Sequence, residues 1–168
     1  MELPSGFSLR AYEGGDANAV RRLHAAAFRT LAAGHHSPAQ IAAHEALIMA
    51  PAYADDLAQS RLLLALHPTI GLAATAGWLP MTERPGTARI RKVFVHPELA
   101  RRGLASAMVR AAEARAGAAG FTKLFVRANV NAVPLYEKLD YRAIEAGVMP
   151  AGDEGLPVMF MEKAANAL

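Results

Sequence analysis

The sequence contains no cysteine in its 168 residues. This absence excludes disulfide bonds, thiolate metal sites and any mechanism that uses a cysteine nucleophile. It also fits the reducing environment of the cytoplasm, which is the compartment that we expect for this protein.

Long apolar runs are absent too. No uninterrupted apolar stretch reaches the roughly 18 residues that a membrane-spanning helix needs, so we expect no membrane partner. The first residues, MELPSGFSLR, lack the basic segment and the apolar block of a secretory signal. Hydrophobic residues make up 53% of the chain and charged residues 20%. This composition predicts one globular domain over residues 1–168.

Positive charge is concentrated in one stretch. The net charge of the chain is +3, whereas the stretch from Arg84 to Arg102 by itself carries +5. Its basic members, against the single acid Glu98, are Arg84, Arg89, Arg91, Lys92, Arg101 and Arg102. Such a patch suits a nucleic acid or a phosphorylated cofactor, and it is also compatible with a solvated surface. Aromatic residues are few, at 7%, and no helix-turn-helix pair is recognisable, so we expect no nucleic-acid partner.

Hydrophobic periodicity predicts alternating strands and helices. Helices are expected over 17–28, from 38 to about 49, over 104–120 and over 132–139. Strands are expected over 7–12, 61–67, 70–80, 88–95 and 123–129, with a closing pair near 141–147 and 156–163. Asp16 is the expected cap of the first helix, and Ser37-Pro38-Ala39-Gln40 has the form of a capping box. The fold class is therefore α/β (α+β), with a mixed, mostly antiparallel central sheet of six to seven strands flanked by helices on both faces.

The stretch VFVHPELARRGLAS, residues 93–106, joins a strand directly to a helix. A helix N-terminus presents unpaired N–H groups and a partial positive charge, which together favour a phosphate. Gly103 leaves room for a close ligand, Ser106 adds a hydroxyl, and Arg101 adds a charged fork. The stretch has neither the Gly-Lys-Ser/Thr ending of a Walker loop nor the glycines of a GxGxxG turn.

Together with a second motif, this stretch resembles the GNAT acyltransferase superfamily, which transfers acyl groups from coenzyme A to amines. The family's phosphate loop, Gln/Arg-x-x-Gly-x-Gly/Ala, aligns with ARRGLA at 100–105, and its Val-x-Pro aligns with VHP at 95–97. Its downstream motif, Asn-x-x-Ala-x-x-Leu-Tyr-x-x-x-Gly-Phe, aligns with NVNAVPLYEKLDY at 129–141. The resemblance is good over about 88–163 and extends to the N-terminal half only by element order.

The resemblance implies acetyl-CoA as co-substrate, with no metal, and a small-molecule or peptide amine as acceptor. Val93, Phe94 and Val95 would offer backbone groups to the pantetheine arm, and Asn129 would hydrogen-bond the same arm. The pyrophosphate cradle would consist of Arg101, Arg102, Gly103, Leu104, Ala105 and Ser106. Tyr136 would act as the general acid that protonates the departing thiolate. Asn131 fits the N-cap of the short helix better than a ligand contact.

Three positions depart from the family's pattern. Ala100 replaces a Gln or Arg, so one polar contact beside the pyrophosphate is missing, although Arg101 is adjacent. Asp140 replaces a glycine, and aspartate tolerates the left-handed conformation better than most residues. Arg89 stands where family members often have a glutamate that acts as the general base, and a guanidinium cannot take that role.

The general base therefore stays unassigned. Candidates are an ordered water and the side chains of His96, Glu83, His35, His36 and His44. The pair His35-His36 lacks a third ligand at metal spacing, which disfavours a zinc site. A non-catalytic acyl-CoA-binding domain is an alternative to an enzyme, and the sequence is equally compatible with a monomer and a homodimer.

Side chains alternate along a strand, so the strand at 88–95 predicts Arg89, Arg91, Val93 and Val95 on one face. Two arginines beside the thioester would favour an acceptor that carries an anionic group as well as its amine. Alternatively, neighbouring acidic residues neutralise both arginines or the strand's twist carries them to solvent.

Overall fold

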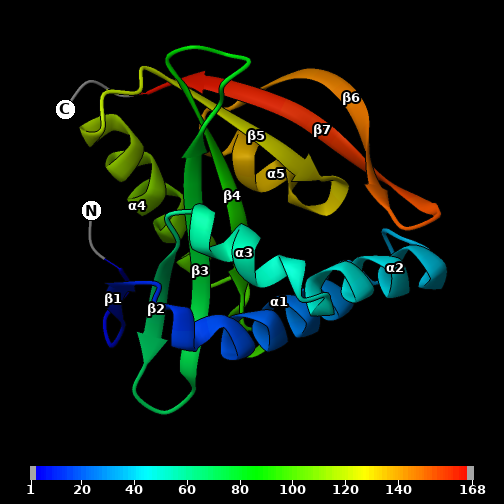
Figure 1. Cartoon of the computed structure of the whole chain (residues 1–168). Helices are drawn as coiled ribbons and strands as arrows, with labels where there is room; N and C mark the ends of the chain where they lie inside the picture. Colours follow the sequence, from blue (N-terminus) through cyan, green and yellow to red (C-terminus); the bar gives the residue numbers. More distant parts are fainter. Residues whose placement is uncertain (1–2, 166–168) are drawn as a thin grey trace.

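The computed structural model describes residues 3–165; residues 1, 2 and 166–168, which belong to the predicted domain, lie outside it (Figure 1). The helices are α1 (Ala17–Leu31), α2 (Pro38–Met49), α3 (Ala52–Gln59), α4 (Leu104–Ala118) and α5 (Val133–Glu137). The strands are β1 (Ser8–Ala11), β2 (Leu63–His67), β3 (Gly71–Pro80), β4 (Thr87–Val95), β5 (Lys123–Asn129), β6 (Arg142–Ala151) and β7 (Glu154–Ala164). None of the described helices is long and apolar enough to cross a membrane.

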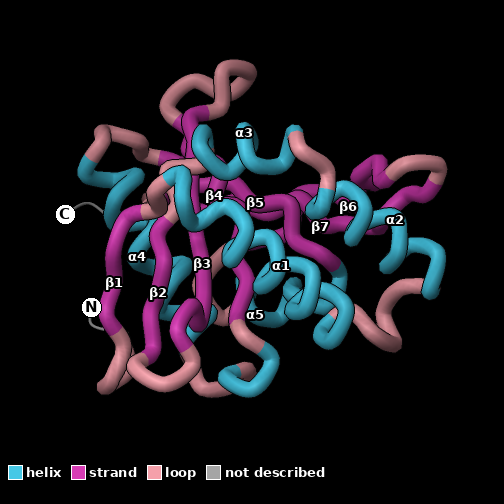
Figure 2. The backbone as a smooth tube through the Cα atoms, turned by 60° about the horizontal axis from the view of Figure 1, so that its bottom comes forward, coloured by secondary structure: helices cyan, strands magenta, loops and turns pink. Residues whose placement is uncertain are grey.

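The strands form one 7-stranded sheet in the order β1-β2-β3-β4-β5-β7-β6. Every neighbouring pair is antiparallel except β4 and β5, which run parallel. Helices α1, α2 and α3 cover one face, and α4 and α5 pack on the other (Figure 2). The structure confirms the predicted mixed, mostly antiparallel sheet with helices on both faces.

The main core lies between the sheet and α4. Leu104, Met108 and Ala112 of α4 are buried against Ile90 of β4 and Leu124 of β5. The three α4 residues are four positions apart and form one continuous apolar stripe, which is the pattern that predicted this helix. The alanines between them let the helix approach the sheet closely.

Local signals place several element ends. Ser37 Oγ accepts a hydrogen bond from the Gln40 N–H at 3.1 Å, and Gln40 Oε1 accepts one from the Ser37 N–H at 2.9 Å, so the predicted capping box is confirmed. Asp16 stands at the N-cap of α1, but its side chain does not cap the helix. Its carboxylate instead pairs with Arg10 at 2.7 Å.

Helix α3 is absent from the sequence prediction. It has eight residues, Ala52–Gln59, and Leu57 is its one buried residue. Two turns are too short for hydrophobic periodicity to identify a helix. This short helix nevertheless supplies Tyr53 and Asp56 to the surroundings of β4.

A bulge interrupts β4. Thr75 and Gly77 of β3 pair with Phe94 and Arg91, so two steps on β3 match three on β4. Lys92 lies in this bulge, between the paired residues Arg91 and Phe94, and its φ of 56° is left-handed. Past this point the side chains exchange faces, which sends Phe94 toward α1 and α2.

The bulge overturns the predicted alternation along β4. Val93 and Val95 pack into the core beside α4, whereas Arg91 reaches Asp56 of α3 on the opposite face. The expectation that Arg89 and Arg91 share a face with Val93 and Val95 is therefore wrong. A strict period of two holds only while the strand has no inserted residue.

Gly77, beside this bulge, has no room for a side chain. A Cβ there would lie 2.3 Å from the backbone oxygen of Ser60. We expect Gly77→Ala to lower the free energy of unfolding by at least about 1–3 kcal/mol, because the backbone must shift. Urea denaturation of both proteins measures the difference.

Gly117→Ala is the matched control. No atom lies within 4 Å of a Cβ at Gly117 in α4, so the same change should stabilise the helix by roughly 0.5–1 kcal/mol. Equal effects of the two substitutions would contradict the close contact at Gly77.

Candidate active site

A cavity of about 720 Å³ opens where β4 and β5 separate. Residues Thr87–Ile90 of β4 pair with Lys123–Val126 of β5, and beyond these pairs the two strands diverge. Helix α1 closes one side of the cavity, and the loop before α4 closes another. The predicted cofactor residues that line it are Val93, Phe94, Val95, Arg101, Gly103, Ala105, Ser106 and Asn129.

Two predicted cofactor residues do not line the cavity. The Arg102 side chain is exposed outside it, and the Leu104 side chain is buried in the core. For Leu104, the backbone N–H is therefore the group that faces the loop. In the predicted cradle at 101–106, the side chains of two of the six residues therefore point away from the cavity, and the backbone of the loop is the continuous feature.

The loop before α4 has two left-handed residues, Arg101 with φ of 62° and Gly103 with φ of 79°. The first intrahelical bond runs from the Ala107 N–H to the Gly103 oxygen at 3.1 Å, so the preceding N–H groups have no partner within the helix. A Cβ built on Gly103 would meet no atom within 4 Å. These free donors and the positive end of the helix dipole form a site suited to phosphate oxygens.

A buried hydrogen-bond chain holds the bulge in β4. The Thr75 hydroxyl donates to the Lys92 carbonyl at 2.6 Å, and it lies 2.8 Å from His24 Nε2. Because that hydroxyl hydrogen is already used, Nε2 must carry the proton and donate to Thr75. His24 Nδ1 is then the acceptor for the Tyr53 hydroxyl, at 2.8 Å.

His24 was missed in the sequence prediction. It is fully buried and stacks on Phe94, with ring centroids 4.0 Å apart. Burial, with Lys92 and His44 nearby, lowers its pKa well below the ordinary value, which keeps the ring neutral. Its position four residues after Val20, on the apolar face of α1, was the available signal.

Tyr136, the predicted general acid, is not among the residues that line the cavity, although its neighbours Pro134 and Leu135 are. It is 4% exposed and belongs to the main core. Its ring meets Tyr141 edge to face, with centroids 5.4 Å apart. Within residues 3–165 its hydroxyl forms no hydrogen bond, and the hydroxyl oxygen is not among the fully buried unpaired atoms. Burial, and secondarily Glu113, raises the pKa of Tyr136, so the phenol stays protonated at neutral pH.

The turn after α5 contains Asp140 with φ of 67°. Aspartate tolerates this left-handed conformation better than most residues, which is how it can replace the family's glycine here. The next residue, Tyr141, donates its hydroxyl to Glu113 at 2.9 Å, and Lys163 pairs with the same carboxylate at 2.9 Å. These contacts fix the ring against which Tyr136 packs.

Asn131 does not cap α5, so that prediction is wrong. The N-cap position of α5 is Ala132, because a 3-10 turn over Val130–Ala132 precedes the helix. Asn131 lines the cavity, and its Nδ2 donates to the Leu31 carbonyl of α1 at 3.3 Å. Its Oδ1 is buried without a partner among the described residues.

The basic stretch predicted from sequence is divided by the fold. Arg101 lies at the cavity, whereas Arg91 and Lys92 both pair with Asp56 on the α3 side, at 2.8 and 2.7 Å. Burial, with Arg91 beside it, lowers the pKa of Lys92 to about 8. The expected single patch is therefore wrong, because Arg91 and Lys92 face α3 whereas Arg101 lies in the loop at the cavity.

The histidines proposed as bases have different surroundings. His35 lines the cavity, and His96 Nδ1 accepts the Glu98 N–H at 3.3 Å within a turn. The His44 ring lies against Phe28 at an interplanar angle of 48°, with centroids 4.1 Å apart. None of these contacts identifies a general base.

The sequence matches the profile of the acetyltransferase (GNAT) family over residues 20–141, and the chain belongs to this family. It is an N-acetyltransferase of the GNAT type, whose members use acetyl-CoA. A search of curated proteins gave no match.

Solved structures share the fold. A GCN5-related N-acetyltransferase from Rhodopseudomonas palustris is 25% identical, with a TM-score of 0.86 and 98% of each chain covered. The PaiA N-acetyltransferase from Thermoplasma acidophilum, solved in complex with coenzyme A, is 14% identical, with a TM-score of 0.76 and coverage of 94% and 98%. The ribosomal-protein-S18-alanine N-acetyltransferase from Escherichia coli is 18% identical, with a TM-score of 0.64 and 96% of each chain covered.

The packing of His44 predicts a loss of stability in acid. Burial, followed by Lys92 and His36, lowers its pKa from 6.5 to about 4. Between these values the unfolded chain binds a proton that the folded protein does not, so stability falls as the pH falls through this window. The complete effect is about 3 kcal/mol.

We expect His44→Gln to have a shallower loss of stability between pH 7 and pH 4.5 than the wild type. Urea denaturation at both pH values measures it, and His35→Gln, at an exposed position, is the control. Parallel pH dependence of wild type and His44→Gln would contradict this assignment.

Proposed function

We propose that the protein transfers the acetyl group of acetyl-CoA to a primary amine by direct attack within a ternary complex. The observation that supports this most is the single cavity wall formed by the end of β4, the start of α4 and the end of β5. It combines free peptide groups and free helix N–H groups, and Leu135 of the same wall is the sequence neighbour of the protonated Tyr136.

Each part of the wall suits one part of acetyl-CoA. The N–H groups around Gly103 and the hydroxyl of Ser106 would bind the pyrophosphate, with Arg101 adding charge. The end of β4, no longer paired with β5, would hydrogen-bond the pantetheine amides as an added strand would. Asn129 lies on the other side of the gap, where its amide would hold the same arm.

The chemical step needs one proton donor. The amine nitrogen bonds to the thioester carbonyl carbon, the C–S bond breaks, and the electron pair leaves on sulfur. Tyr136 would then donate its phenolic proton to the thiolate, the amine's surplus proton passes to water, and water returns a proton to the Tyr136 phenolate. Burial raises the pKa of Tyr136, and exclusion of water by the bound substrates would raise that of the thiol as well.

The cofactor contacts predict unequal stabilisation by two ligands. Acetyl-CoA should raise the melting temperature more than ADP, because only acetyl-CoA has a pantetheine arm for β4. At one hundred times its Kd, a ligand adds about 2.7 kcal/mol of stability. Equal shifts at equal concentrations of the two ligands would contradict the role of the β4 backbone.

Gly103→Ala tests the phosphate cradle in the same assay. The left-handed φ of 79° strains any L side chain, and the new Cβ extends into open space beside the helix N-terminus. The substitution should lower stability by about 1 kcal/mol and weaken both ligands. Unchanged affinity for both would place the phosphates elsewhere.

Tyr136→Phe tests the general acid. The substitution keeps the ring packing and removes only the hydroxyl, so acetyl-CoA should bind as before while kcat falls by roughly 10²–10⁴. Release of the CoA thiol measures turnover. The control is Tyr141→Phe, which removes a hydroxyl bonded to Glu113 and should leave kcat near the wild-type value. Normal turnover by Tyr136→Phe would show that Tyr136 is a packing residue and not the general acid.

A further inference from the structure

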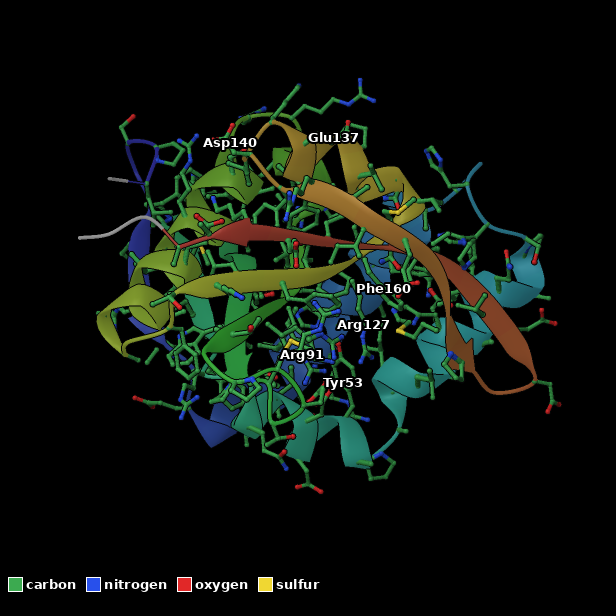
Figure 3. The ribbon with its side chains drawn as sticks, turned by 90° about the horizontal axis from the view of Figure 1, so that it is seen from above. Tyr53, Arg91, Arg127, Glu137, Asp140 and Phe160 are labelled. Atoms are coloured by element: carbon green, nitrogen blue, oxygen red, sulfur yellow. The ribbon has the colours of Figure 1, made fainter. Side chains whose placement is uncertain are left out.

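Four basic side chains lie on the sheet face that α1, α2 and α3 cover, just before β4 and β5 reach the cavity. They are Arg89, Arg91 and Lys92 of β4 and Arg127 of β5. Figure 3 shows Arg91 and Arg127 gathered near Tyr53 and Phe160, with Glu137 and Asp140 beyond the sheet on its other side. We call these four residues the basic cluster.

Two members of the basic cluster share one carboxylate. Asp56 of α3 lies 2.8 Å from the Arg91 guanidinium and 2.7 Å from the Lys92 ammonium. Lys92 also lies over the ring of Tyr53, at 3.8 Å from its centroid. Arg91 and Lys92 are therefore held in place by the protein itself, and Asp56 has little capacity left for a third cation.

The other two members have no such partner. Within residues 3–165 neither Arg89 nor Arg127 forms an ion pair or a hydrogen bond, and Arg89 Nε is buried without an acceptor. The charges nearest to Arg89 are Arg91 and Arg127, of like sign, and the carboxylates of Asp56 and Glu83. The five groups around this point carry an excess of positive charge.

The partial burial of Arg89 makes this arrangement costly. Burial and the two neighbouring arginines lower the pKa of Arg89 to about 10, so it is still charged at neutral pH. Buried charges in proteins are normally paired, and a guanidinium presents a fork of donors that matches a carboxylate. Arg89 is half-buried and its Nε is fully buried without an acceptor, which leaves its donors for a ligand that supplies the missing anion.

Both strands lead from the basic cluster into the cavity. Arg127 comes two residues before Asn129 on β5, so the two side chains share a face. On β4, Arg91 and Phe94 share that face across the bulge. At about 3.3 Å per residue, the Cα atom of Arg127 lies about 7 Å from that of Asn129, which is within reach of a small acceptor.

We propose that Arg89 and Arg127 bind a carboxylate of the acceptor, and that the acceptor is a small amino acid-like molecule whose amine receives the acetyl group. This assignment rests on the proposed acetyl transfer. The carboxylate would lie against the two free guanidinium groups while the amine extends along β5 toward the thioester. A polyamine would meet net positive charge at the same point and be repelled.

The test uses pairs of amines that differ only by a carboxylate, namely phenylalanine with phenethylamine and lysine with cadaverine. Release of the CoA thiol gives kcat/KM for each. The carboxylated member should be preferred, and Arg89→Gln and Arg127→Gln should each reduce that preference by roughly 10- to 100-fold, as expected for a lost charge-assisted hydrogen bond. Arg89→Lys, which keeps the charge without the fork, should fall between.

Arg115→Gln is the matched control, because it removes the same charge from an exposed position on α4, across the sheet. It should leave the preference unchanged. The shift in melting temperature produced by acetyl-CoA checks that each variant is folded. Because Arg127 is exposed on β5, Arg127→Gln keeps the test valid if Arg89→Gln does not fold.

A binding measurement separates this inference from the proposed function. N-acetylphenylalanine and N-acetylphenethylamine are titrated into the CoA-bound protein, where binding needs no turnover. Stronger binding of the carboxylated product, lost in Arg127→Gln, supports the carboxylate site even if no amine is acetylated, an outcome that would count against the proposed function alone. Equal binding of both products, or better turnover of cadaverine than of lysine, overturns the carboxylate site and leaves the acetyl transfer standing.

Discussion

Parallel pairing between β4 and β5 ends at Ile90 and Val126, and the cavity exists because the two strands separate there. The separation needs β4 to turn away from its neighbour without losing its contacts to β3. One inserted residue does this, and the left-handed Lys92 is part of it. The His24–Thr75 chain binds the Lys92 carbonyl, which gives the bulge a fixed geometry, because both side chains are fully buried.

The same bulge divides the chemistry of the site between the two faces of the sheet. Val93 and Val95 belong to the core beside α4, whereas Arg91 belongs to the opposite face. One strand can therefore carry a neutral wall for an extended cofactor and, a few residues earlier, a charged surface. Asp56 balances only part of that charge, so the sheet face beyond the cavity stays positive.

Sequence patterns identified most of the fold because the informative signals were local. The strand at Lys123–Asn129, the capping box at Ser37 and the start of α4 at Leu104 all depend on neighbouring residues alone. The GNAT resemblance rested on the loop at 100–105 and the motif at 129–141, and the family profile over 20–141 agrees with it. Most of the predicted cofactor residues meet at one cavity because two motifs at strand ends determine their positions.

By itself, the sequence determined the order of the elements, the loop that offers free N–H groups at Gly103, and the left-handed turn at Asp140, since each follows from conformational preferences within a few residues. Only the tertiary structure decided the rest. The bulge at Lys92, the link from Asn131 to α1 and the separation of Arg101 from Arg91 all depend on contacts between segments far apart in the chain. A strand's period of two gives no sign of an inserted residue, because the insertion is stabilised by hydrogen bonds from other elements.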